Sequence, residues 1–376
     1  MRVGYLTYGL DRAPTGIGRY AVELLHAMAA LPKAPTFVLL TTEAKDSHGL
    51  WKEFEHHPLP GCRLLPALMT LGNLFLPLAI QRFKLEILHD PNGIAPFLGP
   101  ALGTKRVVTI YDAFAYVFPE THNLLDNWRY RWMLPFSAKR AAAVTTISEC
   151  SRQDLQRFLR LKEIQLIPAA INSHFRPIPE TPERLAILTR YGISRPYILY
   201  VGGINARKNI ARLFEAFANL RKNQPDLFLV IAGKRQWQTK EIDATFQRLE
   251  LEQAVHFTGY VADEDLPALY SAAKMFVFPS LYEGFGLPPL EAMACGTPVI
   301  TANSSSLPEV VEDAALLIDP YDVEALTKAM QRILTEPELA AELRAKGLIQ
   351  AQKFTWARTA QETVHLYETL LANAPA

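Results

Sequence analysis

Short apolar runs alternate with longer amphipathic stretches along most of this chain. In the first half, runs rich in β-branched residues and bounded by turn residues predict strands at residues 3–8, 37–42, 87–89, 107–110, 144–147 and 165–167. The stretches between them predict helices at residues 18–30, 126–139 and 149–159. Because the strand runs are apolar on both faces, they are typical of a parallel sheet covered by helices on both sides.

A proline-rich stretch separates this alternation from a second one. Residues 174–182 contain three prolines in nine positions, a composition that resists regular structure and predicts a linker and hinge. Beyond it, strands are predicted at residues 197–201, 228–232, 255–257, 275–278, 299–301 and 316–318. Only helical periods follow, at residues 323–335, 337–353 and 355–371, the last with Thr355 as its N-cap.

Length and composition agree with two α/β domains. The chain has 376 residues, enough for two to three domains that each bury a core. The 39 Lys and Arg residues nearly balance the 38 Asp and Glu residues, so nothing global predicts binding to nucleic acid. The three cysteines, Cys62, Cys150 and Cys295, lie far apart, which argues against a disulfide framework and a zinc site. The N-terminus lacks the long apolar region of a signal peptide, so we expect a cytoplasmic protein.

Two stretches raise the question of a membrane. Residues 64–81 carry no charge over eighteen positions, but prolines, Gly72 and Asn73 interrupt them, so we predict a helix in the core or facing a cleft and not a transmembrane span. A basic stretch between Arg129 and Lys162 interleaves Trp128 and Trp132. It predicts either a solvated helix face or peripheral contact with the inner membrane surface or a phosphorylated acceptor.

A glycine-rich segment follows the first predicted strand. Residues 15–21 read T-G-I-G-R-Y-A and match the GxGxxA pattern of a dinucleotide-binding turn, with Glu43 some twenty residues further on. An NAD-dependent oxidoreductase is therefore one alternative. The glycines come eight residues after the strand, later than such a turn requires, so the segment equally fits an anion-binding approach to a helix N-terminus or a loop without a ligand.

A cationic turn opens the second domain. Arg207 and Lys208 follow the strand that ends at Val201 and directly precede a helix predicted over residues 210–220. Cations at the positive end of a helix are locally unfavourable, and an anion would remove the conflict. A diphosphate fits best, because arginine offers it a bidentate fork and lysine a point charge. The alternative is two solvated surface cations.

An acidic pair follows a later strand of the same domain. Glu283 is placed in the loop after residues 275–278, and Glu291 in the opening turn of a helix that Pro288 and Pro289 help to start. Both carboxylates then lie at the carboxyl end of a parallel strand, where open α/β sheets bind ligands. A capping role at the helix start is the alternative.

Other acidic residues carry weaker signals. Residues 263–265 read D-E-D and formally match the D-x-D that holds manganese in metal-dependent sugar transferases, but they are typical of the acidic first turn of the helix that follows. We therefore predict no metal site. Asp90 and Asp112 each follow a strand of the first domain, where either binds at a cleft edge or caps a loop.

Taken together, these motifs resemble those of the retaining GT-B glycosyltransferases of family four, and closest is the bacterial mannosyl- and rhamnosyltransferase-like branch. The resemblance covers nearly the whole chain. It is carried by G-I-G-R-Y at residues 16–20, T-I-S-E at 146–149, I-P-A-A-I at 167–171, R-K-N at 207–209, the acidic pair Glu283 and Glu291, and A-C-G-T-P-V at 294–299.

The resemblance implies a fold: two Rossmann-like α/β domains that face each other across a cleft, with a C-terminal helix that crosses back to the first. We expect an acceptor-binding domain at residues 1–175, a nucleotide-sugar-binding domain at 176–354 and the returning helix at 355–376.

The resemblance also implies residue roles. Arg207 and Lys208 bind the diphosphate, Gly16 approaches it from the other domain, and Glu291 binds the ribose hydroxyls. Glu283 and the amides of Gly284, Phe285, Gly286 and Leu287 surround the donor sugar, while the base lies near Val261. This chain departs from the family at Tyr111–Asp112, where many members have His-Asp, and at Gly203, where some relatives have arginine. The first departure leaves the acceptor-side catalytic group open, and the second leaves phosphate binding to Arg207 and Lys208.

The activity that follows is metal-free transfer of a hexosyl group from GDP-mannose or a UDP-sugar, with retention, to a saccharide, lipid-linked or other hydroxyl acceptor. Arg207 and Lys208 would stabilise the departing phosphate, which itself helps to deprotonate the acceptor hydroxyl, and Asp112 would orient that hydroxyl. No cofactor is expected. Besides the oxidoreductase, a non-catalytic sugar-nucleotide-binding protein is an alternative.

Overall fold

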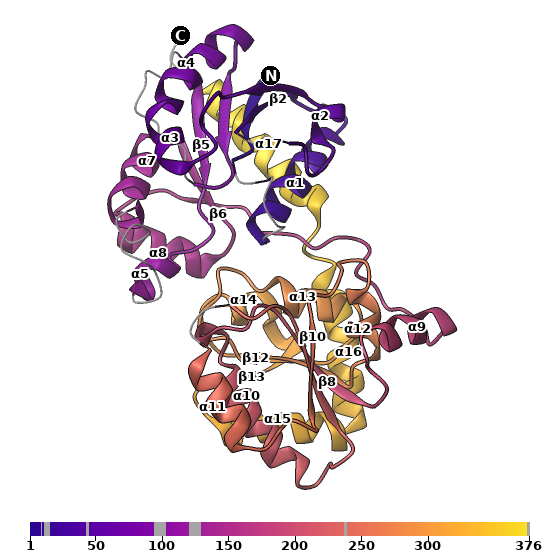
Figure 1. Ribbon diagram of the computed structural model, residues 1–376. Helices are drawn as coiled ribbons and strands as arrows, with labels where there is room; N and C mark the ends of the chain where they lie inside the picture. The colour runs from indigo at the N-terminus through magenta and orange to yellow at the C-terminus, as the bar shows by residue number, and fades with distance from the viewer. Residues whose placement is uncertain are drawn as a thin grey trace. The chain divides into compact units, whose positions relative to one another are not determined.

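The chain folds into two compact units, drawn in Figure 1. The computed structural model describes residues 1–8, 10, 16–42, 45–93, 103–119, 129–236 and 239–373. Unit 1 comprises Met1–Ala170 together with Thr355–Ala376, and unit 2 comprises Ile171–Phe354. The chain therefore leaves unit 1 a few residues before the proline-rich stretch and returns to it for its last helix.

The proline-rich stretch is packed within unit 2 and is not a free linker. The ring of Phe175 is buried and lies edge-on to that of Tyr270, at 6.1 Å. The backbone amide of Ile178 donates a hydrogen bond of 3.0 Å to the hydroxyl of Ser271. The prolines prevent regular structure, as predicted, but the apolar side chains between them find partners in the second unit.

Unit 1 is built on a seven-stranded parallel sheet with the order β3-β2-β1-β4-β5-β6-β7. Its strands are β1 (Arg2–Leu6), β2 (Thr36–Thr41), β3 (Glu55–Pro58), β4 (Ile87–Asp90), β5 (Lys105–Thr109), β6 (Ala143–Thr146) and β7 (Gln165–Leu166). The pattern of apolar runs predicted all of these strands except β3. That strand reads E-H-H-P and is largely exposed at the edge of the sheet, so it lacks the apolar run by which buried strands are recognised.

Helices cover both faces of this sheet. On one face lie α3 (Leu65–Thr70), α4 (Gly72–Phe83), α7 (Leu134–Arg140) and α8 (Glu149–Leu159), whose buried residues join one apolar core with those of the strands. On the other lies α1 (Gly16–Ala29), packed against α17 (Trp356–Ala372), and Figure 1 shows both layers. Short helices α2 (Leu50–Glu53) and α5 (Phe114–Val117) complete the unit, and a π-helical turn, Arg129–Met133, precedes α7.

Two predicted helices differ from the structure. The uncharged stretch at residues 64–81 forms the two helices α3 and α4 and not one, and no described helix is both long enough and apolar enough to cross a membrane. The helix predicted over residues 126–139 is described only from residue 129 onward, as the π-helical turn and α7. Trp128 lies outside the described residues.

A buried network ties the returning helix α17 to unit 1. The hydroxyl of Tyr367 lies 2.6 Å from Nδ1 of His89 in β4, and Nε2 of His89 lies 2.8 Å from the hydroxyl of Thr109 in β5. The ring of Trp356, at the start of α17, lies 5.4 Å from that of Tyr20 in α1. The helix begins at the predicted N-cap, since the side chain of Thr355 accepts a hydrogen bond from the amide of Arg358. The predicted return of the C-terminal helix to the first domain is thereby confirmed.

Unit 2 is built on a six-stranded parallel sheet with the order β10-β9-β8-β11-β12-β13. Its strands are β8 (Tyr197–Val201), β9 (Phe228–Ala232), β10 (Val255–Gly259), β11 (Met275–Phe278), β12 (Val299–Ala302) and β13 (Ala315–Ile318). Its helices are α9 (Pro182–Arg190), α10 (Ile210–Arg221), α11 (Lys240–Arg248), α12 (Leu266–Ala272), α13 (Leu287–Ala294), α14 (Leu307–Val311), α15 (Val323–Thr335) and α16 (Pro337–Ala351).

Candidate active site

The strand order of unit 2 reverses between two neighbouring strands. Strands β8 and β11 pair in parallel at the centre of the sheet, and the order of strands runs in opposite directions on either side of them. Connections from two such strands leave to opposite faces of the sheet, and open α/β sheets bind ligands at the carboxyl ends of strands at such a point. The cationic turn follows β8 and the acidic loop follows β11, and both predicted motifs therefore meet at this point.

The local conformation of the cationic turn is set by Asn205 and Asn209. The side chain of Asn205 accepts a hydrogen bond from the amide of Lys208 and caps a 3-10 turn, Ala206–Lys208. Asn209 then takes a left-handed conformation, with φ of 58°, which ends that turn and lets α10 begin at Ile210. The two cations thus lie on a separate turn before α10, not on its first turn.

Close packing of two glycines fixes this turn against the next strand. A Cβ atom on Gly233, directly after β9, would lie 1.9 Å from the carbonyl oxygen of Gly202, and Gly233 has a φ of 153°. Only glycine fits there. The side chain of Gln236, from the same loop, accepts a hydrogen bond of 2.7 Å from the amide group of Asn205.

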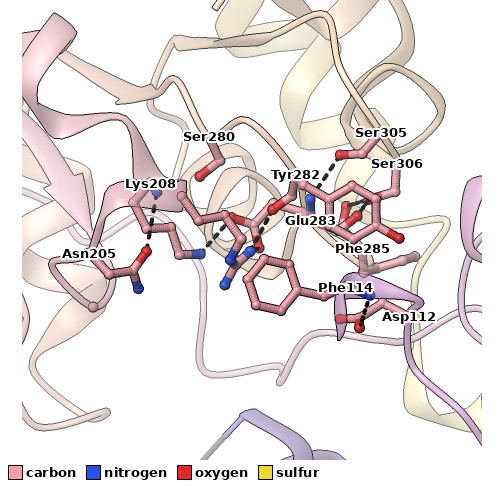
Figure 2. A network of polar contacts seen from close by, with 12 residues as sticks. Asp112, Phe114, Asn205, Lys208, Ser280, Tyr282, Glu283, Phe285, Ser305 and Ser306 are labelled. Atoms are coloured by element: carbon pink, nitrogen blue, oxygen red, sulfur yellow. Dashed lines mark hydrogen bonds and ion pairs between the residues drawn. The ribbon is translucent and has the colours of Figure 1, made fainter. Parts of the chain in front are cut away.

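The side chains of Arg207 and Lys208 converge on one carboxylate, that of Glu283. Figure 2 shows the contact between Lys208 and Glu283. Nζ of Lys208 lies 2.5 Å from Oε1 of Glu283, and Nη1 of Arg207 lies 2.8 Å from Oε2. All three side chains are largely buried, with exposed fractions of 20% for Arg207, 11% for Lys208 and 12% for Glu283. We call these three residues the charged cluster. With two cations and one anion, it keeps a net positive charge.

The charged cluster holds Glu283 in its ionised form. Burial alone would raise the pKa of this carboxyl, but the charges of Arg207 and Lys208 outweigh burial and lower the pKa to about 2. Glu283 is therefore a hydrogen-bond acceptor and a negative charge at neutral pH, and not a proton donor. The sequence motifs predict that the three residues share one site, but not that they pair.

The loop that carries Glu283 is held by serines that the sequence analysis did not identify. The hydroxyl of Ser305 accepts a hydrogen bond of 2.8 Å from the amide of Glu283, and the hydroxyl of Ser306 lies within 2.9 Å of the carbonyl oxygens of both Glu283 and Phe285 (Figure 2). Both serines follow β12, the next strand in the sheet. Their signal is the run of three serines at residues 304–306 at the end of a predicted strand.

A glycine and two prolines shape the start of α13. Gly286 has a φ of 128°, and a Cβ atom there would lie 2.9 Å from the side chain of Leu307, so this position requires glycine. Pro288 and Pro289 have no N–H group, so Leu287 provides the only backbone amide among the first three residues of the helix. Within this stretch, backbone amides that could bind a ligand therefore lie in the loop segment that ends at Leu287.

Glu291 lies further along α13 than predicted. The helix begins at Leu287, which places Glu291 just beyond the opening turn. Its carboxylate is buried and accepts a hydrogen bond of 2.9 Å from the hydroxyl of Tyr270 in α12. Tyr270 is a partner that the sequence analysis missed, because nothing in the spacing of the two residues places α12 beside α13.

Val261 is buried in the loop after β10, two strands from the cationic turn. Its neighbour Tyr260 is 54% exposed, and Nζ of Lys234 lies 5.0 Å from the centre of the Tyr260 ring. An exposed aromatic face beside a cation lies on the same edge of the sheet as the charged cluster. That edge therefore presents both charged and aromatic groups to a ligand.

The remaining predicted residues belong to unit 1. Gly16 is exposed at the start of α1, and no described atom lies within 4 Å of the position of a Cβ there. Tyr111 is buried, donates a hydrogen bond of 2.6 Å to the carbonyl of Pro91 and lies edge-on to Tyr20. Asp112 accepts a hydrogen bond of 3.0 Å from the amide of Phe114, the first residue of α5. Asp112 thus caps a loop through its side chain, and the hydroxyl of Tyr111 supports the fold of unit 1.

The D-E-D segment has a structural role. Asp265 is the N-cap residue of α12, and its carboxylate accepts hydrogen bonds from Arg190, at 2.9 Å, and from the hydroxyl of Tyr191, at 2.7 Å. Among the residues that the structure describes, no group of three or more His, Cys, Asp or Glu side chains is arranged to hold a metal ion. Glu43, the acid of the dinucleotide pattern, lies outside the described residues.

Comparison with known proteins accounts for both halves of the chain. Residues 14–175 match the family described as Glycosyltransferase Family 4, and residues 191–349 match the family described as Glycosyl transferases group 1. The chain is 32% identical over 395 residues to the O-antigen chain mannosyltransferase B of Escherichia coli, in an alignment that covers 98% of this chain and 100% of that protein.

Solved structures match over almost the whole length as well. The sucrose-phosphate synthase of Thermosynechococcus elongatus aligns with a TM-score of 0.81 at 25% identity, over 99% of this chain and all of that one. Anabaena HepE in complex with UDP-glucose aligns with a TM-score of 0.75 at 18% identity, over 98% of this chain and 100% of that one. These neighbours confirm the predicted GT-B fold of two parallel-sheet α/β units.

Proposed function

This chain belongs to the glycosyl transferases of group 1 and is a glycosyltransferase, and we propose that it transfers a mannosyl group, with retention, from GDP-mannose to a saccharide or lipid-linked hydroxyl. The observation that carries this proposal is the charged cluster at the carboxyl ends of β8 and β11. A net positive group of buried side chains at the switch point of the sheet is a site for an anion. A nucleotide diphosphate sugar supplies that anion and the leaving group of the reaction.

The chemistry assigned to Arg207 and Lys208 is stabilisation of the leaving group. As the bond between the anomeric carbon and the phosphate oxygen breaks, negative charge grows on the diphosphate and the sugar becomes oxocarbenium-like. Preorganised cations that face this charge lower the barrier, because they need no reorganisation during the reaction. We assign this work to the two side chains and the loop amides up to Leu287, without a metal ion.

We assign two roles to Glu283. Before the donor binds, its carboxylate holds both cations in place at 2.5 and 2.8 Å. With donor bound, the same negative charge lies beside the sugar and favours its positive transition state. Because its pKa is lowered to about 2, Glu283 acts by charge and hydrogen bonding at neutral pH and not as a general acid.

Retention is assigned to a reaction on one face of the sugar. The acceptor oxygen forms a bond to the anomeric carbon from the side on which the phosphate leaves, and the departing phosphate oxygen takes the proton of the acceptor hydroxyl. Asp112 orients that hydroxyl and Gly16 approaches the diphosphate. Nuclear magnetic resonance of the product tests this step: a product with the anomeric configuration of the donor is expected, and inversion would overturn the mechanism.

The nucleoside is assigned to the edge formed by α13 and the loop after β10. Glu291, held by Tyr270, accepts hydrogen bonds from the ribose hydroxyls, and the base lies beside Val261. A mannosyl donor is favoured because the Escherichia coli relative is named a mannosyltransferase, whereas the HepE neighbour holds UDP-glucose. A UDP-sugar is therefore the second candidate donor.

Thermal-shift measurements with GDP-mannose, UDP-glucose, and ADP- and dTDP-sugars separate these donors. A ligand at a hundred times its Kd stabilises the folded protein by about 2.7 kcal/mol, so one nucleotide should raise Tm well above the others. We expect GDP-mannose to do so, and Lys208→Ala to abolish the shift. A larger shift with UDP-glucose would make a UDP-sugar the donor in place of GDP-mannose. No shift with any nucleotide sugar would contradict the assigned site.

A further inference from the structure

Four leucines are exposed along one side of helices α3 and α4. The exposed fractions are 66% for Leu64, 43% for Leu71, 60% for Leu74 and 55% for Leu78. Leu71, Leu74 and Leu78 are three and four residues apart, so they form a stripe on one face of α4, and Leu64 precedes α3 by one position. We call these four residues the leucine stripe.

Loose packing of the helices does not explain why the leucine stripe is exposed. The opposite side of the same segment is firmly buried, with Leu68, Leu76 and Ile80 each at most 4% exposed in the core of unit 1. Turning the stripe inward would expose these residues instead. The segment is therefore apolar on both faces, and within the described part of unit 1 only one of the two faces is buried.

Basic residues predominate in the sequence around the leucine stripe. Residues 59–85 contain Arg63, Arg82 and Lys84 and no acidic residue. The next residue, Glu86, has its carboxylate 3.7 Å from the amino group of Met1. All three cations are exposed, and they flank the stripe at both of its ends. Leucines bordered by exposed cations are the composition of a segment that lies at the surface of an anionic bilayer.

A second segment of the same helix layer has the same character. Residues 129–148, which contain α7, carry four basic residues and no acidic one. Trp132 is 69% exposed and Phe136 is 38% exposed, with the guanidinium of Arg140 4.1 Å from the centre of the Phe136 ring. Tryptophan and basic residues together are enriched at membrane interfaces. Buried residues of α7 and α4 join the same core, so both segments lie on one side of the sheet (Figure 1).

We propose that this helix layer of unit 1 docks on an anionic membrane surface, with the leucine stripe in the interface and the flanking cations on the lipid phosphates. Helices α3 and α4 have six and twelve residues, too few to span a bilayer, so the contact is peripheral. A stripe of leucines flanked by exposed cations matches lipid headgroups over acyl chains better than another copy of this surface, because the flanking cations would then face each other. The inference does not depend on which sugar is transferred.

Co-sedimentation of the full-length protein with vesicles tests the docking. We expect the protein to bind vesicles of phosphatidylethanolamine and phosphatidylglycerol, and to bind vesicles of phosphatidylcholine alone at least about tenfold more weakly. The double variant Leu74→Ser with Leu78→Ser should lower the partition coefficient by about tenfold or more. The variant Arg82→Gln with Lys84→Asn should weaken binding to the anionic vesicles only; asparagine is chosen because Lys84 has a φ of 48°.

The matched control removes exposed apolar residues of unit 2. Leu185 is 51% exposed and Ile349 is 65% exposed, and Leu185→Ser with Ile349→Ser should leave vesicle binding unchanged. Circular dichroism and Tm establish that each variant folds. The proposal is overturned if wild type stays in the supernatant, if the leucine variant binds as wild type does, or if wild type forms dimers without vesicles that the leucine variant does not. The last outcome would assign the stripe to self-association.

Discussion

Lys208 donates a hydrogen bond of 2.5 Å to Glu283, and this contact joins the loops that leave two neighbouring strands on opposite sides of the switch point. It turns two motifs that lie 75 residues apart in the sequence into one site. The lysine is itself buried, with its ammonium 4.8 Å from the centre of the Phe278 ring. Lys208 and Arg207 share the carboxylate of Glu283, so the charged cluster keeps a net positive charge that is suited to a second anion.

Replacing Lys208 by alanine should lower kcat/KM by about 10²- to 10³-fold, because a preorganised cation on the departing phosphate is lost. Sugar transfer from labelled donor measures this directly. Lys274→Ala is the matched control: Lys274 is exposed directly before β11, and its loss should leave kcat/KM unchanged. A rate for Lys208→Ala close to that of wild type would contradict the assigned role.

Activity should persist in the presence of EDTA. The reason is that Arg207 and Lys208 supply the positive charge that a metal ion provides in other transferases. Initial rates are compared in EDTA, in buffer alone and after addition of manganese, and we expect the three to agree. Loss of turnover in EDTA with recovery in manganese would show that a metal ion, and not Arg207 and Lys208, stabilises the leaving group.

The strands of unit 2 show what the sequence makes predictable. Buried parallel strands such as β8, β9 and β11 have apolar runs bounded by turn residues, and each is predicted to the residue. Edge strand β3 is not predicted, because an exposed strand needs no apolar run. The family motifs indicate which loops carry the candidate site, since their residue types and order are local features.

Contacts between loops were not predictable in the same way. That Glu283 pairs with both cations depends on β8 lying beside β11, which is a property of the strand order and not of either motif. Ser305 and Tyr270 are found only in the structure for the same reason. Local sequence patterns thus indicate candidate site residues, and the topology of the sheet decides which of them are in contact.

The stability of unit 2 should depend on Glu283 at acidic pH. Its pKa is about 2 in the folded protein and near 4.5 when unpaired, so the unfolded chain binds the proton more readily between these values. Stability from this group is present above pH about 4.5 and is lost as pH falls toward about 2, by about 3 kcal/mol in total. Acid titration of the free energy of unfolding should therefore show a smaller loss over this window in Glu283→Gln than in wild type. An identical loss would mean that the cations do not stabilise the carboxylate.

His89 should destabilise unit 1 in a different pH window. Burial lowers the pKa of this histidine from 6.5 to about 3, so the neutral ring is the folded form. The unfolded chain takes up the proton first, and stability falls as pH decreases from about 6.5 toward about 3, by up to about 1.4 kcal/mol per pH unit. Tm measured across this window should fall less steeply in His89→Gln. The control is His365→Gln, an exposed histidine of α17, whose Tm should follow that of wild type; an unchanged slope in His89→Gln would contradict the prediction.

Tyr270 should act on donor binding through Glu291. In Tyr270→Phe the buried carboxylate loses the hydroxyl that donates to it at 2.9 Å, which costs about 1–3 kcal/mol of stability and frees the side chain from the position that ribose binding requires. We therefore expect a lower Tm and a raised KM for the donor, with a smaller change in kcat. Tyr197→Phe separates the two effects, because the hydroxyl of Tyr197 donates at 2.6 Å to the carbonyl of Leu269 in the same helix α12 and does not bond Glu291. This control should lower Tm and leave the KM for the donor unchanged. Equal KM values for the two variants would show that the bond to Tyr270 supports the fold but does not position the carboxylate for the nucleotide.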